Sequence, residues 1–240
     1  MQLKANLHFH TADDPKDAVL YSTKEGIDRA AELGFNVLAL TCHTKVAWTP
    51  EYAAYAEARG ITLLSGIECN IGEIAGEKRH VVLLNCGRGA EHVRTFYDLE
   101  RYKKEHPGVF VLAPHPFYPH LSDTISLMEY TDKYAHLFDG IEHSWFYTTF
   151  LNKNLPAIEA AKRHNLPLIA TSDTHFTNFL DTDYCIIDAA DQTPEAILDS
   201  LRAGSFKNVT RPKRFIREFL IPISLYSLRN HIFNARFLRR

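Results

Sequence analysis

The sequence predicts an α/β fold, a distorted (β/α)7 barrel followed by a basic C-terminal helical tail. Short apolar segments alternate with helix-like segments from residue 3 to residue 203. The apolar segments show no polar alternation, which is typical of strands buried on both faces, and strands that alternate with helices form parallel β-α units. Seven or eight units favour a barrel, although the periodicity alone also allows an open sheet. We expect a barrel domain over residues 1–210 and a tail over residues 211–240.

The expected elements follow in chain order. The strands, each a short apolar segment, are 3–8, 36–41, 61–67, 80–85, 109–113, 139–142 and 167–172, with 184–187 as an eighth. The helices between them are 23–33, 51–59, 91–105, 124–137, 151–164 and 194–203. The first helix has a capping box, because Glu25 stands three residues after the N-cap Ser22.

The composition is that of a globular protein with a sizeable core, since 45% of the residues are hydrophobic and 23% are charged. The net charge of -2 hides a basic tail, in which eight Lys and Arg residues face the single acid Glu218. The four cysteines are scattered and no secretory leader precedes them, so we expect reduced thiols in the cytoplasm. No apolar segment reaches the roughly 18 to 20 residues that span a bilayer, so we expect no transmembrane segment.

Metal-binding side chains follow five of the expected strands. They are His8 and His10 in "LHFHT", His43 in "TCH", Glu68 in "GIECN", His115 in "APHPF", and Asp173 and His175 in "TSDTH". The carboxyl ends of parallel barrel strands open on one face, so these side chains should converge. Residues i and i+2 of a strand point to the same side, so His8 and His10 can bind one ion. Glu68 could bridge two cations about 3.5 to 4 Å apart. One histidine at a strand end usually has a structural role, but five coincidences indicate a metal site.

Three residues fit this pattern less clearly. His80 opens its strand, so it would lie at the far end of a parallel barrel unless that strand is short or reversed. Glu142 and His143 both end the sixth strand, and the pleat allows only one of them to face inward. The sequence does not choose between these two.

The ordered motifs resemble those of the PHP family, named for its polymerase and histidinol phosphatase members. They are "HFHT", "LALTCH", "GIE", "RHVVLL", "APHP" and "TSDTH", spread over residues 3–176. The resemblance implies a distorted barrel of seven β-α units that holds up to three divalent metals and hydrolyses phosphoesters. The implied ligand sets are His8, His10, Glu68 and Asp173 for one metal, Glu68, His80 and His115 for a second, and His43 with His175 for a third. A metal role for His80 follows from this resemblance alone.

Two motifs depart from the family pattern. The usual T-D-H is "TCH" here, with Cys42 in place of the Asp, which keeps the histidine but removes any hydrogen bond from that carboxylate. The usual "SDG" segment is replaced by "TADDPKDAV". We assign its third-metal role to Asp17, which stands five residues before the Ser22 cap, with Asp14 as the alternative. An acidic loop without a metal role is the other interpretation of both.

These motifs predict a metal-dependent phosphoesterase that hydrolyses a phosphomonoester or phosphodiester through a metal-bound hydroxide at a di- or trinuclear site. We expect two or three ions of zinc, manganese or iron per chain. Glu68 and His175 are the predicted catalytic residues, and Lys45, Arg79 and Tyr147 are candidates for substrate contact. The expected partner is a small phosphorylated substrate; nucleic acid is a less favoured one.

Three alternatives remain open. Barrel amidohydrolases also start with H-x-H, but they often place a Lys where this chain has Glu68, which favours phosphoester chemistry. A stand-alone nuclease could use the tail, whose Arg residues are interleaved with Phe, Leu, Ile and Tyr, a pattern that also suits an anionic membrane surface. We favour a tail that docks as an amphipathic helix on the barrel, or on a second subunit of a homo-oligomer. A scaffold that has lost its ligands is disfavoured by the nearly complete ligand set.

Overall fold

The computed structural model describes residues 1–74, 77–118 and 126–237. The strands are β1 (Gln2–Phe9), β2 (Val37–Leu40), β3 (Thr62–Ile71), β4 (Arg79–Leu84), β5 (Phe110–Ala113), β6 (Gly140–Ser144), β7 (Leu168–Thr171), β8 (Tyr184–Asp188) and β9 (Phe206–Val209). The α-helices are α1 (Thr23–Glu32), α2 (Pro50–Glu57), α3 (Phe96–Glu105), α4 (Glu129–Lys133), α5 (Asn154–His164), α6 (Pro194–Arg202) and α7 (Ile221–Phe237). Shorter helical turns are η1 (Arg88–His92), η2 (Ala135–Leu137), η3 (Thr177–Phe179) and η4 (Phe215–Leu220).

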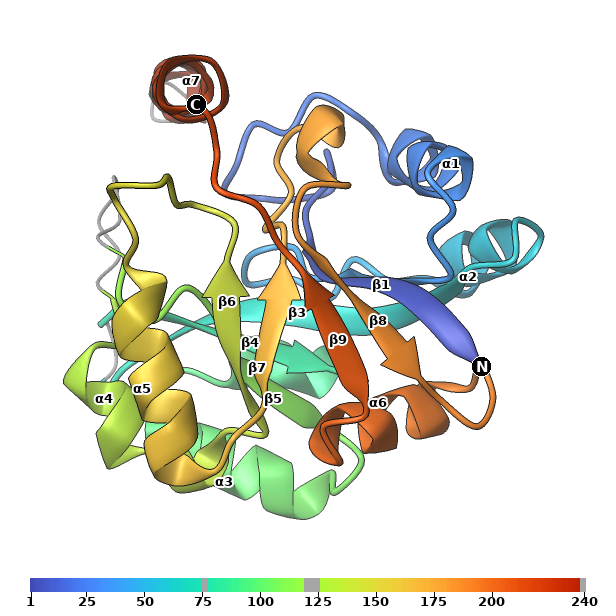
Figure 1. Ribbon diagram of the computed structural model, residues 1–240, viewed down its shortest axis with the longest axis vertical. Coiled ribbons are helices and arrows are strands. Elements are labelled where there is room, and N and C mark those ends of the chain that lie inside the picture. Colours follow the sequence, from blue (N-terminus) through green and yellow to red (C-terminus); the bar gives the residue numbers. More distant parts are fainter. Residues whose placement is uncertain (75–76, 119–125, 238–240) are drawn as a thin grey trace.

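The strands form one sheet in the order β7-β6-β5-β4-β3-β2-β1-β8-β9. This sheet curls into a nearly closed barrel with helices around it, and α7 lies on the side toward which the carboxyl ends of β6 and β7 point (Figure 1). The predicted α/β barrel with a helical C-terminal segment is therefore confirmed. Within the described residues, no helix is long and apolar enough to cross a membrane.

Two strands run against the expected parallel direction. β4 is antiparallel to both β3 and β5, and β8 is antiparallel to β1. The physical reason for the reversal of β4 is the short connection over residues 72–78, which leaves no room for the crossover helix that a parallel pair needs. The reversal brings the start of β4, and with it His80, to the same end of the barrel as the carboxyl ends of its parallel strands.

The barrel closes between β7 and β1 through few backbone bonds. Thr174 follows β7 and forms a parallel bridge with Phe9, in which the His10 amide donates to the Thr174 carbonyl at 3.2 Å. Beside it, the Asn208 side chain of β9 accepts from the Ala170 amide at 2.9 Å and donates to the Leu168 carbonyl at 2.7 Å. An amide side chain thus satisfies the exposed edge of β7. β9 itself was not predicted.

Three apolar clusters hold the elements together. One fills the barrel interior with residues such as Leu7, Val82 and Leu112, and the other two pack beneath the surrounding helices. β1 changes its facing along its length: Leu7 belongs to the interior cluster, whereas Phe9, two residues later, packs on the outside beside α1. The pairing of β1 with β2 shifts register between Asn6 and Phe9. This irregularity turns His8 and His10 into the barrel.

Four of the expected helices have counterparts within a few residues of their predicted bounds, and α1 has its capping box from Ser22. The expected helix 91–105 is divided, because Thr95 and Asp98 form a second capping box that starts α3. The expected helix 124–137 is represented by α4 and η2, separated at Tyr134, whose φ is -113°; residues 124 and 125 lie outside the described residues.

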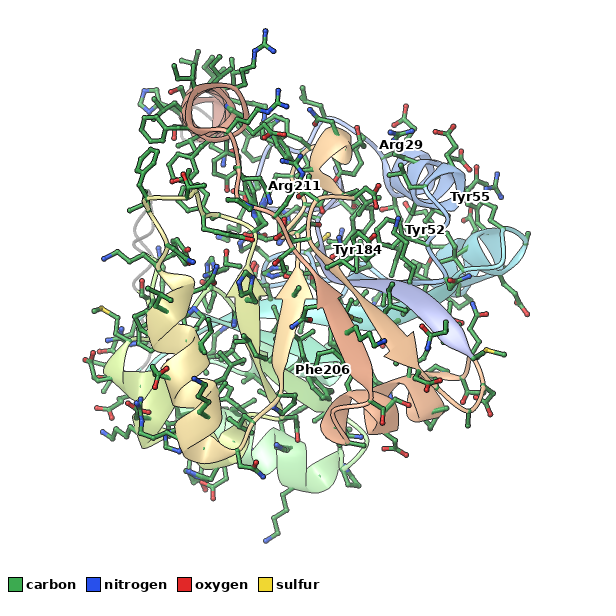
Figure 2. The ribbon with its side chains drawn as sticks, viewed as in Figure 1. Arg29, Tyr52, Tyr55, Tyr184, Phe206 and Arg211 are labelled. Atoms are coloured by element: carbon green, nitrogen blue, oxygen red, sulfur yellow. The ribbon has the colours of Figure 1, made fainter. Side chains whose placement is uncertain are left out.

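The outer helices are joined by polar contacts as well as apolar ones. Tyr55, labelled in Figure 2, extends from α2 toward α1, where its hydroxyl donates to Asp28. Arg211, also labelled there, follows β9 and pairs with Glu218, the acid of the tail, at 2.6 Å.

The four cysteines are free and buried, as expected for reduced thiols.

Candidate metal centre

Glu68 lies at the centre of the polar end of the barrel. Its carboxylate oxygens face five imidazoles, at 3.3 Å from His8 Nε2, 3.4 Å from His10 Nε2, 2.9 Å from His43 Nε2, 2.7 Å from His80 Nδ1 and 3.2 Å from His115 Nε2. The residue is 1% exposed. Burial raises the pKa of Glu68, but the imidazoles of His80, His43 and His8 lower it well below its usual range. A carboxylate in this position stays ionised.

Asp173 and His175 complete one side of the cluster. An Asp173 oxygen lies 3.5 Å from His8 Nε2 and 3.3 Å from His10 Nε2. His175 stacks on His10 with ring centroids 4.3 Å apart, and its Nε2 lies 2.8 Å from an Asp17 oxygen. All nine side chains predicted as metal ligands therefore lie in one continuous group at this end of the barrel, with Asp17 at its rim.

Several ligand atoms come close enough to share a cation. Four triads have their ligand atoms within 4.8 Å of one another: His8, His10 and Asp173; His8, Glu68 and His115; His43, Glu68 and His80; and His10, His43 and His175. The first three overlap the sets that the motif resemblance implied for two of the metals. The fourth adds His10 to the implied pair of His43 and His175.

Buried atoms without partners test whether these residues fit a metal. His8 Nε2, His10 Nε2 and Asp173 Oδ1 are buried and make no hydrogen bond with any described residue. Buried polar atoms are normally paired, and an unpaired one costs about 1–3 kcal/mol. Imidazole nitrogens and carboxylate oxygens are the donors that zinc, manganese and iron bind. The residues therefore fit a divalent metal in both chemistry and position.

The Nδ1 atoms of His8, His10 and His43 each lie close to a carboxylate on the side away from Glu68. Glu142 lies 2.9 Å from His8 Nδ1, and Asp14 lies 2.8 Å from His10 Nδ1 and 2.9 Å from His43 Nδ1. Such contacts fix the ring orientation and leave Nε2 directed toward the centre. Asp14 also accepts a hydrogen bond from the His43 amide at 2.8 Å. It thus supports two rings in a chain where the second motif has Cys42 in place of the usual Asp.

These supporting contacts settle one question that the sequence left open. Glu142 faces inward to His8, and His143 lies on the opposite side of β6, where its ring packs against Tyr147 at 5.2 Å between centroids. Burial lowers the pKa of His143 to about 4. The sequence left the choice between Glu142 and His143 open because a strand-end carboxylate next to a histidine gives no signal of which one faces inward.

Three positions around the site have strained backbone. Thr44, His115 and Asp173 have φ angles of 55°, 28° and 41°, in the left-handed region that favours glycine. Each such residue costs of order 1–3 kcal/mol and persists only where the surroundings impose it. Two of the three are predicted ligands, so the strain coincides with the aiming of their side chains into the barrel.

The charges of the cluster are strongly coupled. Burial lowers the pKa of His10, yet the carboxylates of Asp14, Asp173 and Glu68 raise it to about 10. Burial raises the pKa of Asp173, but His8 and His175 lower it well below its usual range. A proton on an imidazole and a divalent cation thus compete for the same electrostatic site.

The C-terminal helix reaches this site. The Tyr226 hydroxyl donates to Asp17 Oδ2, and Asn230 Nδ2 donates to Asp17 Oδ1 at 2.9 Å. The Tyr226 ring also lies edge-on to His175, with centroids 5.0 Å apart. The helix therefore docks on the barrel at the loop that carries Asp17, as we favoured for the tail, but through polar contacts, while its apolar Leu225, Leu228 and Ile232 stay exposed.

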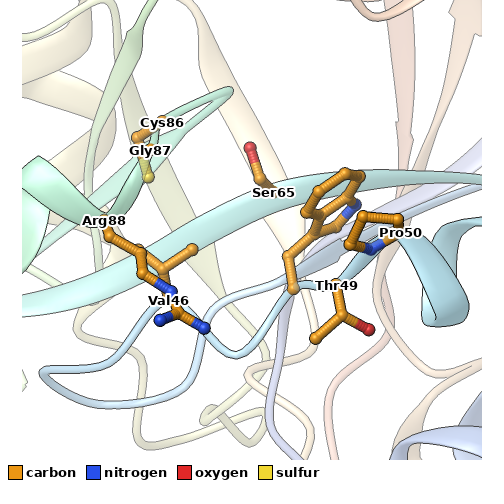
Figure 3. A pocket seen from close by; sticks show the side chains of 8 residues that line it. Val46, Thr49, Pro50, Ser65, Cys86, Gly87 and Arg88 are labelled. Atoms are coloured by element: carbon orange, nitrogen blue, oxygen red, sulfur yellow. The ribbon is translucent and has the colours of Figure 1, made fainter.

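The remaining candidates lie farther from the centre. Lys45 is exposed and donates to the Asp13 carbonyl at 3.4 Å. Arg79 donates to the Ser126 carbonyl at 2.7 Å and stacks over Tyr130. A separate hollow of about 290 Å³ is lined by Val46, Trp48, Thr49, Pro50, Ser65, Cys86, Gly87 and Arg88 (Figure 3). It contains none of the nine predicted ligands.

Comparison with known proteins gives an independent view of the same residues. The family model of the PHP domain matches residues 6–204. Among curated proteins, none matches the chain. A solved structure with a similar fold is a two-domain protein from Bacteroides vulgatus that contains a predicted PHP-like metal-dependent phosphoesterase. It has a TM-score of 0.65 at 18% identity and covers 88% of this chain and 65% of its own.

Two other solved structures are also similar. The lesion-specific endonuclease EndoQ from Pyrococcus furiosus has a TM-score of 0.60 at 15% identity and covers 87% of this chain and 58% of its own. An amidohydrolase from Chromobacterium violaceum has a TM-score of 0.52 at 19% identity and covers 71% of this chain and 87% of its own. At these identities the likeness is one of fold. The chain spans less than two thirds of the Bacteroides and Pyrococcus proteins.

Proposed function

Because the chain belongs to the PHP domain family, we propose that it is a metal-dependent phosphoesterase that hydrolyses a small phosphate ester. The observation that carries the proposal is the Glu68 carboxylate facing five buried imidazoles. A purely structural role does not explain this arrangement, since buried polar atoms in it lack partners within the described residues.

The proposed ligands divide among two or three ions of zinc, manganese or iron. His8, His10, Glu68 and Asp173 would hold one ion; Glu68, His80 and His115 a second; and His43, His175 and Asp17 a third. Bound divalent cations lower the pKa of coordinated water toward about 7 and neutralise charge on phosphoryl oxygens. Glu68 is the bridging residue in this proposal because both of its oxygens face imidazoles from different strands.

If the site holds two ions and His175 binds none, His175 is the proposed source of the leaving group's proton. Its side chain is 12% exposed, whereas those of His8 and His10 are fully buried. Asp17 lies 2.8 Å from its Nε2 and can keep the ring aligned. A rim position with a carboxylate partner suits a group that must meet the departing oxygen and exchange protons with solvent.

The position of α7 supports a small substrate over a polymer. Tyr226 and Asn230 contact Asp17, so the helix covers one side of the polar end of the barrel. A helix on that side narrows the approach for a long nucleic acid strand. The likeness of fold to an endonuclease keeps nuclease activity as the second candidate, and the panel of substrates below separates the two.

The test is elemental analysis of the purified full chain together with a panel of phosphomonoesters, phosphodiesters and oligonucleotides. We expect two or three divalent ions per chain and turnover that a chelator abolishes and added metal restores. His10→Ala should lose bound metal and turnover. His92→Ala, at an exposed histidine outside the cluster, is the matched control and should retain both. Full activity in His10→Ala would reject the assignment of the site.

A further inference from the structure

One residue of α7 is placed to meet a substrate. Arg229 lies between Tyr226 and Asn230, the two residues whose side chains fix the helix to Asp17. The helix is also held by Asn230 Oδ1, which accepts from the Ala18 amide at 2.9 Å. These contacts fix the part of the helix that carries Arg229 beside the loop of Asp17.

The Arg229 guanidinium is packed between aromatic rings at the rim of the site. Its central carbon lies 4.7 Å from the centroid of Phe176 and 5.9 Å from that of Tyr226. Phe176 directly follows His175, and Tyr226 packs on the His175 ring. Both of the rings that hold the guanidinium are therefore in contact with, or adjacent to, the proposed proton donor.

Two nitrogens of this group are buried without partners. Nε and Nη2 of Arg229 make no hydrogen bond with any residue in the described ranges. Two other cations of the tail have anionic partners: Arg211 pairs with Glu218, and Lys213 pairs with Asp183. A guanidinium keeps its charge when buried, and burying its N–H groups without a partner costs free energy. An anion bound to these N–H groups would offset that cost.

The geometry of the two nitrogens specifies the kind of anion. Nε and Nη2 form one edge of the planar guanidinium, with parallel N–H groups that match two oxygens of a phosphoryl or carboxylate group. A carboxylate from the chain itself does not occupy this edge within the described residues. Both nitrogens are closed off from solvent, so an external oxyanion would reach this edge by displacing the groups that cover it, at the rim of a cluster that fits divalent cations.

We propose that Arg229 binds the phosphoryl group of the substrate, so that the C-terminal helix supplies a specificity residue of the active site. This inference rests on the proposed function, because it places the phosphoryl group at the metal cluster. It names the substrate class as one with a terminal phosphate, whose two free oxygens can meet the guanidinium edge while the remaining oxygens face the cluster. The aromatic rings keep the guanidinium in position and exclude water from it.

The test measures the binding of inorganic phosphate to the metal-loaded full chain by calorimetry. Arg229→Gln should weaken phosphate binding by about tenfold or more, as expected for the loss of a charge-assisted pair of hydrogen bonds. Arg217→Gln makes the same change of charge at an exposed position of the tail and should stay within about twofold of the wild type. Metal content, measured on each sample, should be equal in all three proteins.

Arg229→Lys provides a second variant that keeps the charge and the aliphatic stem, should Arg229→Gln fold poorly. It should weaken phosphate binding less than Arg229→Gln but measurably, because an ammonium lacks the two-donor edge. Unchanged phosphate affinity in Arg229→Gln or in Arg229→Lys would overturn the inference, as would an equal loss in Arg217→Gln or a wild type that binds no phosphate.

Turnover of p-nitrophenyl phosphate separates this inference from the proposed function. A wild type that binds phosphate through Arg229 but hydrolyses no ester would reject the function and leave Arg229 as an oxyanion-binding residue without a substrate role. A wild type that hydrolyses esters, with Arg229→Gln unaltered in KM and in phosphate affinity, would reject the inference and keep the function. The expected result is a raised KM in Arg229→Gln with bound metal retained.

Discussion

The two halves of the barrel interior are built from the same strands but are lined by different side chains, apolar in one half and ionisable in the other. In one half, residues such as Val82, Leu112 and Ile169 form a continuous apolar cluster. In the other half, the side chains that continue the same inward rows are imidazoles and carboxylates. In β4, Val82 belongs to the apolar cluster, and His80, two residues away, faces Glu68 at 2.7 Å.

The difference lies in what each half requires of its residues. Apolar contacts are not directional, so the apolar half needs volume and shape, and swaps that conserve volume cost less than about 1.5 kcal/mol. The polar half depends on directed contacts, and the removal of one partner leaves another buried and unpaired. We therefore expect the apolar half of the barrel to tolerate substitutions that conserve volume, and the polar half to tolerate few substitutions. Each of the following substitutions tests that difference.

The largest effect is expected from Glu68→Gln, which keeps the size of the side chain but removes its charge. Five imidazoles face this carboxylate, so we expect the loss of at least one bound ion and a fall in kcat of about 10³-fold or more. Elemental analysis and steady-state kinetics measure both. Glu100→Gln, the same change at an exposed residue of α3, is the control and should match the wild type.

A smaller effect is expected from the residues behind the imidazoles. Glu142→Gln and Asp14→Asn leave the proposed ligands in place but weaken the contacts that orient them. We expect a loss of metal affinity of about 10–100-fold, with full occupancy regained at high metal concentration. Competition with a chelator measures this affinity. An affinity equal to that of the wild type in both variants would show that ring orientation does not depend on these carboxylates.

The apolar half should give the opposite result. Leu112→Ala removes a fully buried side chain and should lower the free energy of unfolding by about 2–5 kcal/mol, while the folded protein keeps its metal content. Leu112→Met should cost less than about 1.5 kcal/mol. Chemical denaturation and elemental analysis on the same samples test this. Loss of metal in folded Leu112→Ala would mean that the two halves are not separable.

The metal-free protein should show a modest dependence of stability on pH. The folded pKa of His10, raised to about 10, lies above its unfolded value near 6.5. The contribution of His10 to the free energy of unfolding is therefore complete below about pH 6.5 and is lost as pH rises toward 10. The carboxylates of Glu68 and Asp173, with lowered pKa values, stay ionised over this pH interval, so they do not make the free energy of unfolding depend on pH there. We expect the Tm of chelator-treated protein to fall from pH 7 to pH 10, and metal affinity to rise. A Tm that stays constant or rises between pH 7 and pH 10 would contradict the coupling between His10 and the carboxylates around it.

Much of the barrel and most of its polar end were predictable, because strand ends and spaced motifs are local features of the sequence. His8, His43 and Asp173 follow apolar segments directly, and barrel topology alone brings such residues together. His80 was predicted by resemblance only, since the reversal of β4 depends on the length of one connection. The register shift in β1 has no signal in the sequence, yet it turns both of the first histidines inward.

The features that the sequence missed, left open or predicted without their contacts depend on interactions between distant segments. β9 has a polar, half-exposed sequence, and it forms because β8 and the edge of β7 offer it hydrogen bonds. The inward position of Glu142 depends on the pleat of β6, which one residue of slippage would invert. The docking of α7 on Asp17 joins segments more than two hundred residues apart, through a tyrosine and an asparagine that read as ordinary tail residues.

The most direct test of the central claim is anomalous diffraction from crystals of the zinc-loaded protein, measured on both sides of the zinc absorption edge. We predict peaks within about 2.0–2.2 Å of Glu68 oxygens and of nitrogens from the surrounding imidazoles. Zinc peaks confined to surface histidines such as His92, with the cluster around Glu68 holding none, would contradict the account.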